Sequence, residues 1–428
     1  VGSEMCIRDS PPATDSTFAE QPYATFALDF EHQHMVLPNP DALSPSWLGA
    51  ELETPSDSVL GPRPYRVSFS PDIILGSAGY STFFGLQGIT QMLFSDVLGD
   101  HQIYAEANLM LDLKNSNFLI SYAYLPDLID YQFTGFHQVG YVVRSNDSLY
   151  RFRAYGLWGD ALYPFDRFNR LEWGLGIVRA TRENLDAIEP PFEPPLERTL
   201  LVPTLRYVHD DVLWGFFSPL FGSRYYAGIS LTPKLSKTGI GFVTFQGDYR
   251  HYFRLGRWSS LAVRLAGGAS LGPNPQKFFA LGTDNWLNPS FPTRQLPYDL
   301  PEDFMFATAV FPLRGYGVSE RMGSYFALFN AELRFPLFLA LWTSPAPLLV
   351  QALTLVAFTD VGAIWSDRLR LFTTTSTGQR VPEALMLSVG TGMRILLFGF
   401  PFKLDVAWRY TGAAFSKPIY LFSLGYDF

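Results

Sequence analysis

Residues 401–428 decide the fold of this chain, and they read PFKLDVAWRYTGAAFSKPIYLFSLGYDF. In 401–411 one face of an extended strand would carry Phe402, Leu404, Val406, Trp408 and Tyr410. The opposite face would carry Lys403, Asp405 and Arg409. A soluble β-sandwich also alternates, but it does not usually place such charges opposite five bulky apolar residues. We therefore expect a membrane strand whose apolar face meets lipid and whose charged face lines an enclosed interior.

The segment 418–428 alternates in the same way and ends the chain on an aromatic residue. One face would carry Tyr420, Phe422, Leu424, Tyr426 and Phe428. This pattern resembles the signal by which the β-barrel assembly machinery recognises the proteins that it inserts. The alternative is an ordinary amphipathic strand that happens to end in Phe. We expect these five residues to act as the insertion signal, with that machinery as a partner.

The same alternation extends back to Pro64, in segments of roughly ten residues separated by Gly, Pro, Asn and Asp. The sequence predicts an all-β fold, a closed antiparallel transmembrane β-barrel of about sixteen strands, because closure leaves no exposed sheet edge. The expected strands are 65–76, 86–96, 100–113, 116–125, 128–143, 148–157, 168–181, 197–210, 222–234, 239–254, 257–271, 323–336, 349–365, 384–397, 401–411 and 418–428.

The bulk composition agrees with a barrel in the bacterial outer membrane. Charged residues make up 17% of the chain, against roughly 25% in an average soluble domain. Aromatic residues make up 16%, and an apolar outer band in contact with outer-membrane lipid would use them. The net charge of −8 argues against nucleic acid as a partner, because phosphate binding requires a basic face.

One segment is also long and apolar enough for a transmembrane helix. Residues 335–358 contain no charge, and about 20 residues of helix span a membrane. However, Thr343, Ser344, Pro345 and Pro347 lie in its middle, where they would break a helix and favour a turn. We expect two strands joined by a turn.

The N-terminal residues lack the alternation. We expect 1–10, which contain the single cysteine, Cys6, to be a cloning or sequencing scar. Residues 11–64 are rich in Pro, Ser, Asp and Glu, and we expect a linker or the tail of a missing upstream domain. The barrel would then comprise 65–428, as the C-terminal fragment of a longer chain.

The connection 272–322 follows the eleventh expected strand, which makes it the sixth external loop if both barrel ends are periplasmic. We expect fifty residues without regular structure, and such a loop is usually functional. It contains Arg314-Gly315-Tyr316-Gly317. The two glycines permit an unusual backbone path, and an arginine donates a planar fork of hydrogen bonds.

The loop and its flanks resemble the outer-membrane assembly-factor superfamily, the bacterial surface antigen barrels of the Bam and Tam type. In that family a sixteen-stranded barrel folds its sixth external loop back into the lumen, tipped by an Arg-Gly-Tyr/Phe motif. The resemblance is good over 257–428 and only general over 65–256, where the chain looks like barrels that follow a Tol-type β-propeller. Residues 11–64 are too short and irregular for the periplasmic POTRA domain of the family. The flanking matches are Gly267-Gly268, 278–282, 331–336 and 358–362.

The resemblance implies a loop lock formed by Arg314, Gly315 and Tyr316 with two carboxylates. Arg314 would pair with Glu332 and Asp360 inside the barrel. Alternation agrees for Glu332, whereas Asp360 shares its face with Thr354, Val356 and Phe358, so its place in the lumen rests on the family. The alternative for Arg314 is a solvated loop charge.

We therefore expect a non-catalytic component of protein insertion, translocation or secretion, with client outer-membrane or secreted proteins as partners. The rival is a structural anchor or passive pore for a missing periplasmic β-propeller. An enzyme is the third class. The six histidines show no metal spacing and no phosphate loop precedes a helix, so we expect no catalytic, metal-binding or cofactor-binding residue.

Overall fold

The structure is a computed structural model that describes residues 27–28, 35–36 and 65–425. Gaps in this range fall at 82–84, 110–112, 127, 144–147, 187–193, 216–217, 236–238, 294–295, 340–351, 377 and 398–399. The chain divides into two units, 1–66 and 67–428. In the first unit β1 (Ala27–Leu28) pairs with β2 (Met35–Val36). The second unit holds the barrel.

The second unit is a closed antiparallel β-barrel, which confirms the expected fold class. Sixteen long strands follow one another in chain order through the described residues, and β24 is followed by β3 around the ring. A two-residue strand, β11 (Leu213–Trp214), pairs beside β12. The long strands are β3 (Ser70–Ser81), β4 (Gly85–Ser95), β5 (His101–Leu109), β6 (Asn117–Tyr124), β7 (Asp130–Val143), β8 (Leu149–Pro164), β9 (Asn169–Asn184), β10 (Leu196–Asp210), β12 (Pro219–Thr232), β13 (Phe242–Arg254), β14 (Ser260–Leu271), β18 (Tyr325–Leu339), β19 (Ala352–Trp365), β22 (Leu385–Leu397), β23 (Phe400–Arg409) and β24 (Ile419–Leu424).

Each expected strand corresponds to one of these sixteen. The largest difference in length is at 148–157, because β8 continues to Pro164. In the apolar segment 335–358, β18 ends at Leu339 and β19 begins at Ala352, so the described parts are strands; the expected turn lies outside the described residues. Among the described residues, no helix is both long and apolar enough to cross a membrane.

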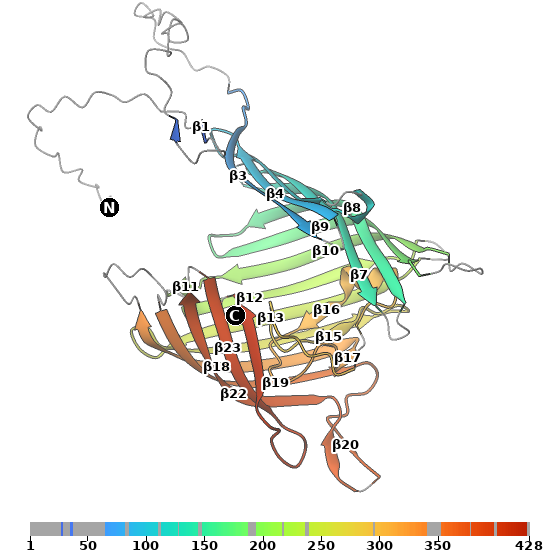
Figure 1. Ribbon diagram of the computed structural model, residues 1–428, viewed down its shortest axis with the longest axis vertical. Helices are drawn as coiled ribbons and strands as arrows, with labels where there is room; N and C mark the ends of the chain where they lie inside the picture. The colour runs from blue at the N-terminus through green and yellow to red at the C-terminus, as the bar shows by residue number, and fades with distance from the viewer. Residues whose placement is uncertain are drawn as a thin grey trace, which may run out of the picture. The chain divides into compact units, whose positions relative to one another are not determined.

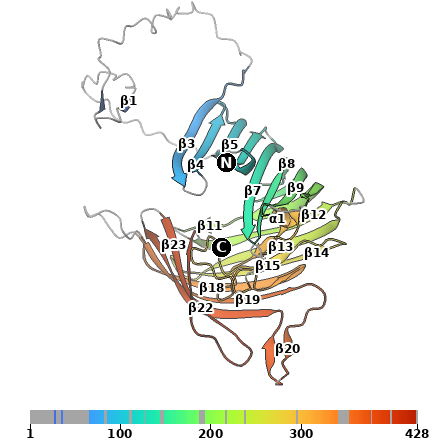
Figure 2. The same cartoon turned by 45° about the vertical axis from the view of Figure 1, so that its right-hand side comes forward.

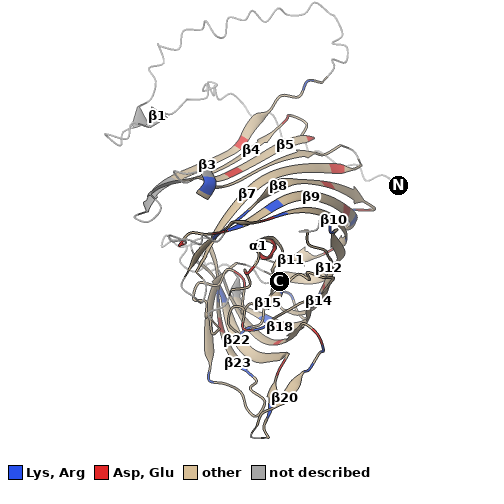
Figure 3. Cartoon of the chain, turned by 90° about the vertical axis from the view of Figure 1, so that its right-hand side faces the viewer, with Lys and Arg blue, Asp and Glu red and all other residues tan. Residues whose placement is uncertain are grey.

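The outer face of the barrel wall is apolar, and its inner face carries both polar and apolar side chains, as β9 illustrates. Trp173, Leu175 and Ile177 are exposed, whereas Val178 and Ala180 are fully buried. Successive side chains of a strand point to opposite faces, so the outward residues form an apolar surface around the ring. Figure 3 shows that charged residues occupy isolated positions along strands that are otherwise uncharged.

The insertion between β14 and β18 corrects one expectation, because part of it has regular structure. A three-stranded sheet is formed by β15 (Phe278–Ala280), β16 (Thr308–Val310) and β17 (Met322–Gly323). A short helix, α1 (Pro301–Phe306), begins with a proline and two acidic residues, which suit a helix N-terminus. Pairing between segments distant in sequence holds this sheet together, and local alternation does not show such pairing.

The insertion lies within the curve of the barrel strands (Figures 1 and 2). Helix α1 lies against β8, β9 and β10. The small sheet packs against the opposite wall, and the members of that apolar cluster are Phe278, Ala280, Val310, Leu313, Tyr316, Leu328, Ile364 and Met386. The expected inward-folding loop is therefore present. A separate hairpin, β20 (Phe372–Thr374) and β21 (Arg380–Pro382), follows β19.

Candidate functional site

The turn at the tip of the insertion requires its two glycines. Gly315 has φ +94°, a conformation that L side chains rarely adopt. A Cβ on Gly317 would lie 2.3 Å from Cδ of Pro292 and 2.8 Å from the carbonyl oxygen of Ser290. The N–H of Tyr316 donates to the carbonyl of Leu313 at 3.1 Å, which closes the turn. The tetrapeptide thus holds a tight backbone path that directs Arg314 to the barrel wall.

Arg314 is brought together with both carboxylates that the resemblance implied. Its Nε and Nη2 donate to Oδ2 and Oδ1 of Asp360, each at 2.7 Å, and its Nη1 donates to Oε1 of Glu332 at 2.6 Å. The backbone N–H of Arg314 also donates to Asp360 Oδ2 at 3.1 Å. All three side chains are at most 2% exposed. Arg314 is therefore a buried and fully engaged cation, and not a solvated loop charge.

Asp360 points into the barrel together with the apolar residues on its face of β19. Thr354, Val356 and Phe358 are all buried with it. The ring of Phe358 lies under the guanidinium of Arg314, with 3.4 Å between Cζ and the ring centroid. The insertion contributes Trp286 to the apolar cluster that contains Val356 and Phe358 on this lumenal face.

The ionic contacts extend beyond the pair of carboxylates that the sequence indicated. Arg334 donates to Glu332 Oε2 at 2.7 Å, and Arg394 donates to Asp405 Oδ1 at 2.8 Å. Asp405 lies 3.9 Å from Nη1 of Arg314, and Arg394 lies 3.9 Å from Glu332. The cluster balances three guanidinium groups against three carboxylates, as burial of charge demands. Its members are Arg314, Arg334, Arg394, Glu332, Asp360 and Asp405.

Sequence analysis missed Arg394 and gave no role to Arg334 or Asp405. Alternation placed Arg334 and Asp405 on the polar faces of their strands, and this was the available signal. It did not indicate which lumenal charges meet, because that depends on the registers between β18, β19, β22 and β23.

Tyr316 ties the tip of the insertion to a third strand. Its hydroxyl donates to the carbonyl of Leu387 at 3.1 Å and accepts the N–H of the same residue at 2.9 Å. Farther along the turn, the N–H of Gly317 donates to Glu320, whose other oxygen accepts a hydrogen bond from Arg409 on β23. The tip is thus bonded to β18, β19, β22 and β23, which form one continuous wall.

Only part of the expected insertion signal falls on described residues. Tyr420 is 66% exposed, and Phe422 and Leu424 alternate with the buried lumenal residues Leu421 and Ser423. Tyr426 and Phe428 lie outside the described residues. The three described residues therefore share the outward face, as the alternation predicted.

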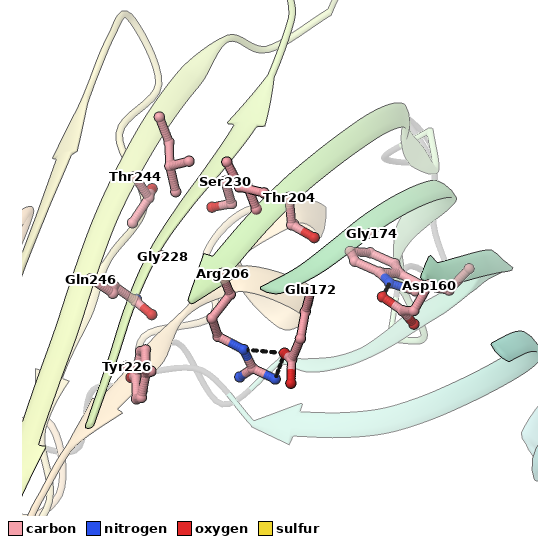
Figure 4. Close-up of a pocket in the computed structure, with 13 residues that line it drawn as sticks. Asp160, Glu172, Gly174, Thr204, Arg206, Tyr226, Gly228, Ser230, Thr244 and Gln246 are labelled. Atoms are coloured by element: carbon pink, nitrogen blue, oxygen red, sulfur yellow. Dashed lines mark hydrogen bonds and ion pairs between the residues drawn. The ribbon is translucent and has the colours of Figure 1, made fainter. Parts of the chain in front are cut away.

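A second polar recess lies on the wall opposite the ionic cluster. It is lined by residues of β8, β9, β10, β12 and β13. Figure 4 shows Arg206 and Glu172 pointing toward each other, and the Arg206 Nε donates to Glu172 Oε2 at 2.6 Å. The indole N–H of Trp158 donates to Asp160 at 2.9 Å. These lumenal polar groups satisfy one another. Among the described residues, no group of three or more His, Cys, Asp or Glu is arranged to hold a metal ion.

The fold is similar to that of solved outer-membrane barrels. No protein-family model and no curated protein matches the sequence. A crystal structure of BamA from Haemophilus ducreyi lacking POTRA domains 1–3 matches with a TM-score of 0.52 and 14% identity, over 84% of this chain and 70% of that chain. The chain therefore shares its fold with a barrel of the Bam type.

Two further structures, both of CdiB, match less well. CdiB from Escherichia coli gives a TM-score of 0.45 at 10% identity, over 85% of this chain and 68% of that chain. CdiB from Acinetobacter baumannii gives 0.41 at 13% identity, over 85% and 60%. These scores are too low to support an argument, so the fold assignment depends on BamA.

Proposed function

We propose that this chain is a surface-antigen-type barrel of the bacterial outer membrane and a non-catalytic component of protein insertion, translocation or secretion. The observation that carries the proposal is the insertion fixed inside the barrel by Arg314, Glu332 and Asp360. A buried pair of this kind holds only when its charges and hydrogen bonds are satisfied together, as they are here. We propose that these residues, with Gly315 and Tyr316, form the loop lock.

The insertion would stiffen the walls that it contacts, including β8, β9 and β10 beside α1, and leave the strands near β3 to move. The insertion is bonded to β18, β19, β22 and β23. On β3, by contrast, the consecutive residues Ile73, Ile74 and Leu75 are all exposed, so neither face of that strand is covered. The flexibility of the barrel would then concentrate near β3, because elements that move are drawn from weakly packed regions. A protein client would be accommodated there without a catalytic step.

The surroundings of the barrel follow from its outer surface. The apolar outward residues would contact outer-membrane lipid. Tyr420, Phe422 and Leu424, on the outward face of β24, support the proposal that the assembly machinery inserts this chain through its last strand. Client outer-membrane or secreted proteins would be the functional partners.

Reconstitution tests the proposal directly. The purified chain is placed in liposomes, an unfolded eight-stranded outer-membrane barrel is added as the probe, and its folding is followed by heat-modifiable gel migration. We expect faster folding than in empty liposomes. Equal rates with and without the chain would reject the assembly role.

The rival role as a passive pore makes a different prediction. In planar bilayers, a steady open current that Arg314→Ala leaves unchanged would support a pore and count against a lumen filled by the insertion. The genomic sequence upstream of Val1 separates the remaining alternatives, because POTRA repeats favour assembly and a β-propeller favours an anchor.

A further inference from the structure

The edge of β24 that faces away from β23 is hydrogen-bonded to a segment of the insertion. The N–H of Leu287 donates to the carbonyl of Phe422 at 2.8 Å, and the N–H of Leu424 donates to the carbonyl of Asn285 at 3.2 Å. Between them, Trp286 and Ser423 form an antiparallel β-bridge. Residues 285–288, which we call the edge segment, therefore pair with β24 as a short additional strand.

This edge is the one that β24 turns away from β23. The N–H of Gly425 donates to Pro401 at the β23 side, and residues alternate in the direction of their backbone groups along a strand. Tyr420, Phe422 and Leu424 consequently direct their N–H and C=O groups to the other edge. The strand order places β3 next on that side. The edge segment thus lies at the seam where the barrel closes.

The side chain of Asn288 extends this pairing by imitating a peptide group. Its Oδ1 accepts the N–H of Phe422 at 2.8 Å, and its Nδ2 donates to the carbonyl of Tyr420 at 3.1 Å. The indole N–H of Trp286 also donates to Asn288 Oδ1 at 2.8 Å, which fixes the amide. One carboxamide therefore satisfies the donor and the acceptor that a neighbouring strand would otherwise satisfy.

The edge segment is held on its lumenal side by side chains and not by a continuous strand. Trp286 packs against the cluster that contains Leu421, Phe358 and Ala407. Asp284, directly before the segment, forms a salt bridge with Lys403 of β23. Two main-chain bonds and one amide are few compared with the ladder that a complete strand makes. A longer strand would therefore compete successfully for the same edge.

We propose that the edge segment is a displaceable cap that keeps the seam edge of β24 unavailable until an extended strand of another polypeptide replaces it. The partner chemistry is a β-strand, because the groups to be satisfied are backbone donors and acceptors at strand spacing. Exposed Tyr420 favours apolar side chains on the lipid-facing side of that strand. The inference deepens the proposed function, on which it rests, by naming the site at which a client strand would add.

Hydrogen–deuterium exchange at residues 419–425 tests the cap in the folded barrel without any client. We expect the amide of Phe422 to be protected, and Asn288→Ala to raise its exchange rate roughly five- to tenfold through loss of one hydrogen bond. Asn288→Asp keeps the acceptor oxygen and should preserve the protection. Leu287→Pro removes a donor that Leu287→Ala retains, so only the proline variant should loosen the edge. A Phe422 amide unprotected in the unmodified protein, or unaffected by Asn288→Ala, overturns the cap.

Strand capture tests the partner. The probe is a biotinylated peptide with the sequence of residues 418–428, PIYLFSLGYDF, and a scrambled peptide is the control. The barrel carries p-benzoyl-phenylalanine at position 420, which provides the photocrosslink. We expect at least roughly fivefold more labelling in Asn288→Ala than in the unmodified barrel, by the same loss of a bond. Equal labelling by the scrambled peptide, or no increase in the variant, overturns strand addition. Because exchange needs no assembly activity, liposome inactivity with an intact cap rejects the proposed function alone.

Discussion

Arg314 and Asp360 form a two-pronged pair in which Nε and Nη2 donate to the two oxygens of one carboxylate, both at 2.7 Å. Arg314 belongs to the insertion and Asp360 to β19, so the pair joins the lumenal plug to the barrel wall. A planar fork of this type fixes direction as well as distance. The position of the insertion is therefore fixed at its tip in both direction and distance.

Removal of the arginine should destabilise the barrel strongly. We expect Arg314→Ala to lower the free energy of unfolding by about 3–5 kcal/mol, because Glu332 and Asp360 lose a buried partner. Arg314→Lys should rescue only part of this loss, since an ammonium group cannot make the fork. Urea unfolding and heat-modifiable migration provide the measurement. Arg254→Ala, at an exposed turn, is the matched control, and equal stability of the two alanine variants would refute the lock.

Arg394 and Asp405, which form the second ionic pair, should be energetically coupled to each other. Arg394→Met and Asp405→Leu each remove one member of the 2.8 Å pair and leave the other buried charge without that bond, so each single variant should lose about 3–5 kcal/mol. The double variant removes both charges and should be more stable than the sum of the two losses predicts. A double-mutant cycle in urea measures the difference. Additive losses would show that the two side chains do not depend on each other.

A methyl group at Gly390 should disturb the lock through the ring of Phe358, which lies under Arg314. An added Cβ would lie 2.2 Å from the Phe358 ring and 2.3 Å from the Val406 carbonyl oxygen. We expect Gly390→Ala to cost about 1–3 kcal/mol by overpacking and to displace the ring beneath Arg314. The control is Gly88→Ala on β4, where an added Cβ meets nothing within 4 Å. Indistinguishable unfolding curves for the two variants would contradict the packing.

The insertion should also be sensitive to pH through Glu302 of α1. Burial raises the pKa of this carboxyl, whose Oε2 lies 3.9 Å from the Nε of Arg198. Because the pKa of Glu302 is raised in the folded state, its neutral form stabilises the folded protein at low pH. This contribution is lost as pH rises through the raised pKa.

We therefore expect thermal stability to fall, as pH rises above the ordinary pKa of a glutamate, more steeply in the unmodified protein than in Glu302→Gln. Apparent melting temperatures from heat-modifiable migration at several pH values measure this slope. Glu106→Gln, on an exposed side chain of β5, should keep the slope of the unmodified protein. A slope unchanged by Glu302→Gln would remove Glu302 as its source.

Much of the fold could be predicted from the alternation of polar and apolar residues along the strands. Lys403 and Asp405 opposite Leu404 and Val406 predicted β23, and the same period predicted the other long strands, because a strand between lipid and an interior must alternate locally. Glu332 was placed in the lumen for the same reason. The Arg-Gly-Tyr-Gly turn was visible because its glycines mark a backbone path that other residues cannot follow.

The tertiary structure decided which side chains and strand edges contact one another inside the barrel. Asp360 lies on a face whose other residues are mostly apolar, and only the structure shows that this face is lumenal and buried. Arg394 joins the ionic cluster, and Asn288 reaches β24, through contacts between segments distant in the chain. The sequence by itself determined which side chains alternate, since this depends on neighbours in the strand. Register and the folding of the insertion into the barrel determined which charges and strand edges are paired, since these depend on residues that no local pattern connects.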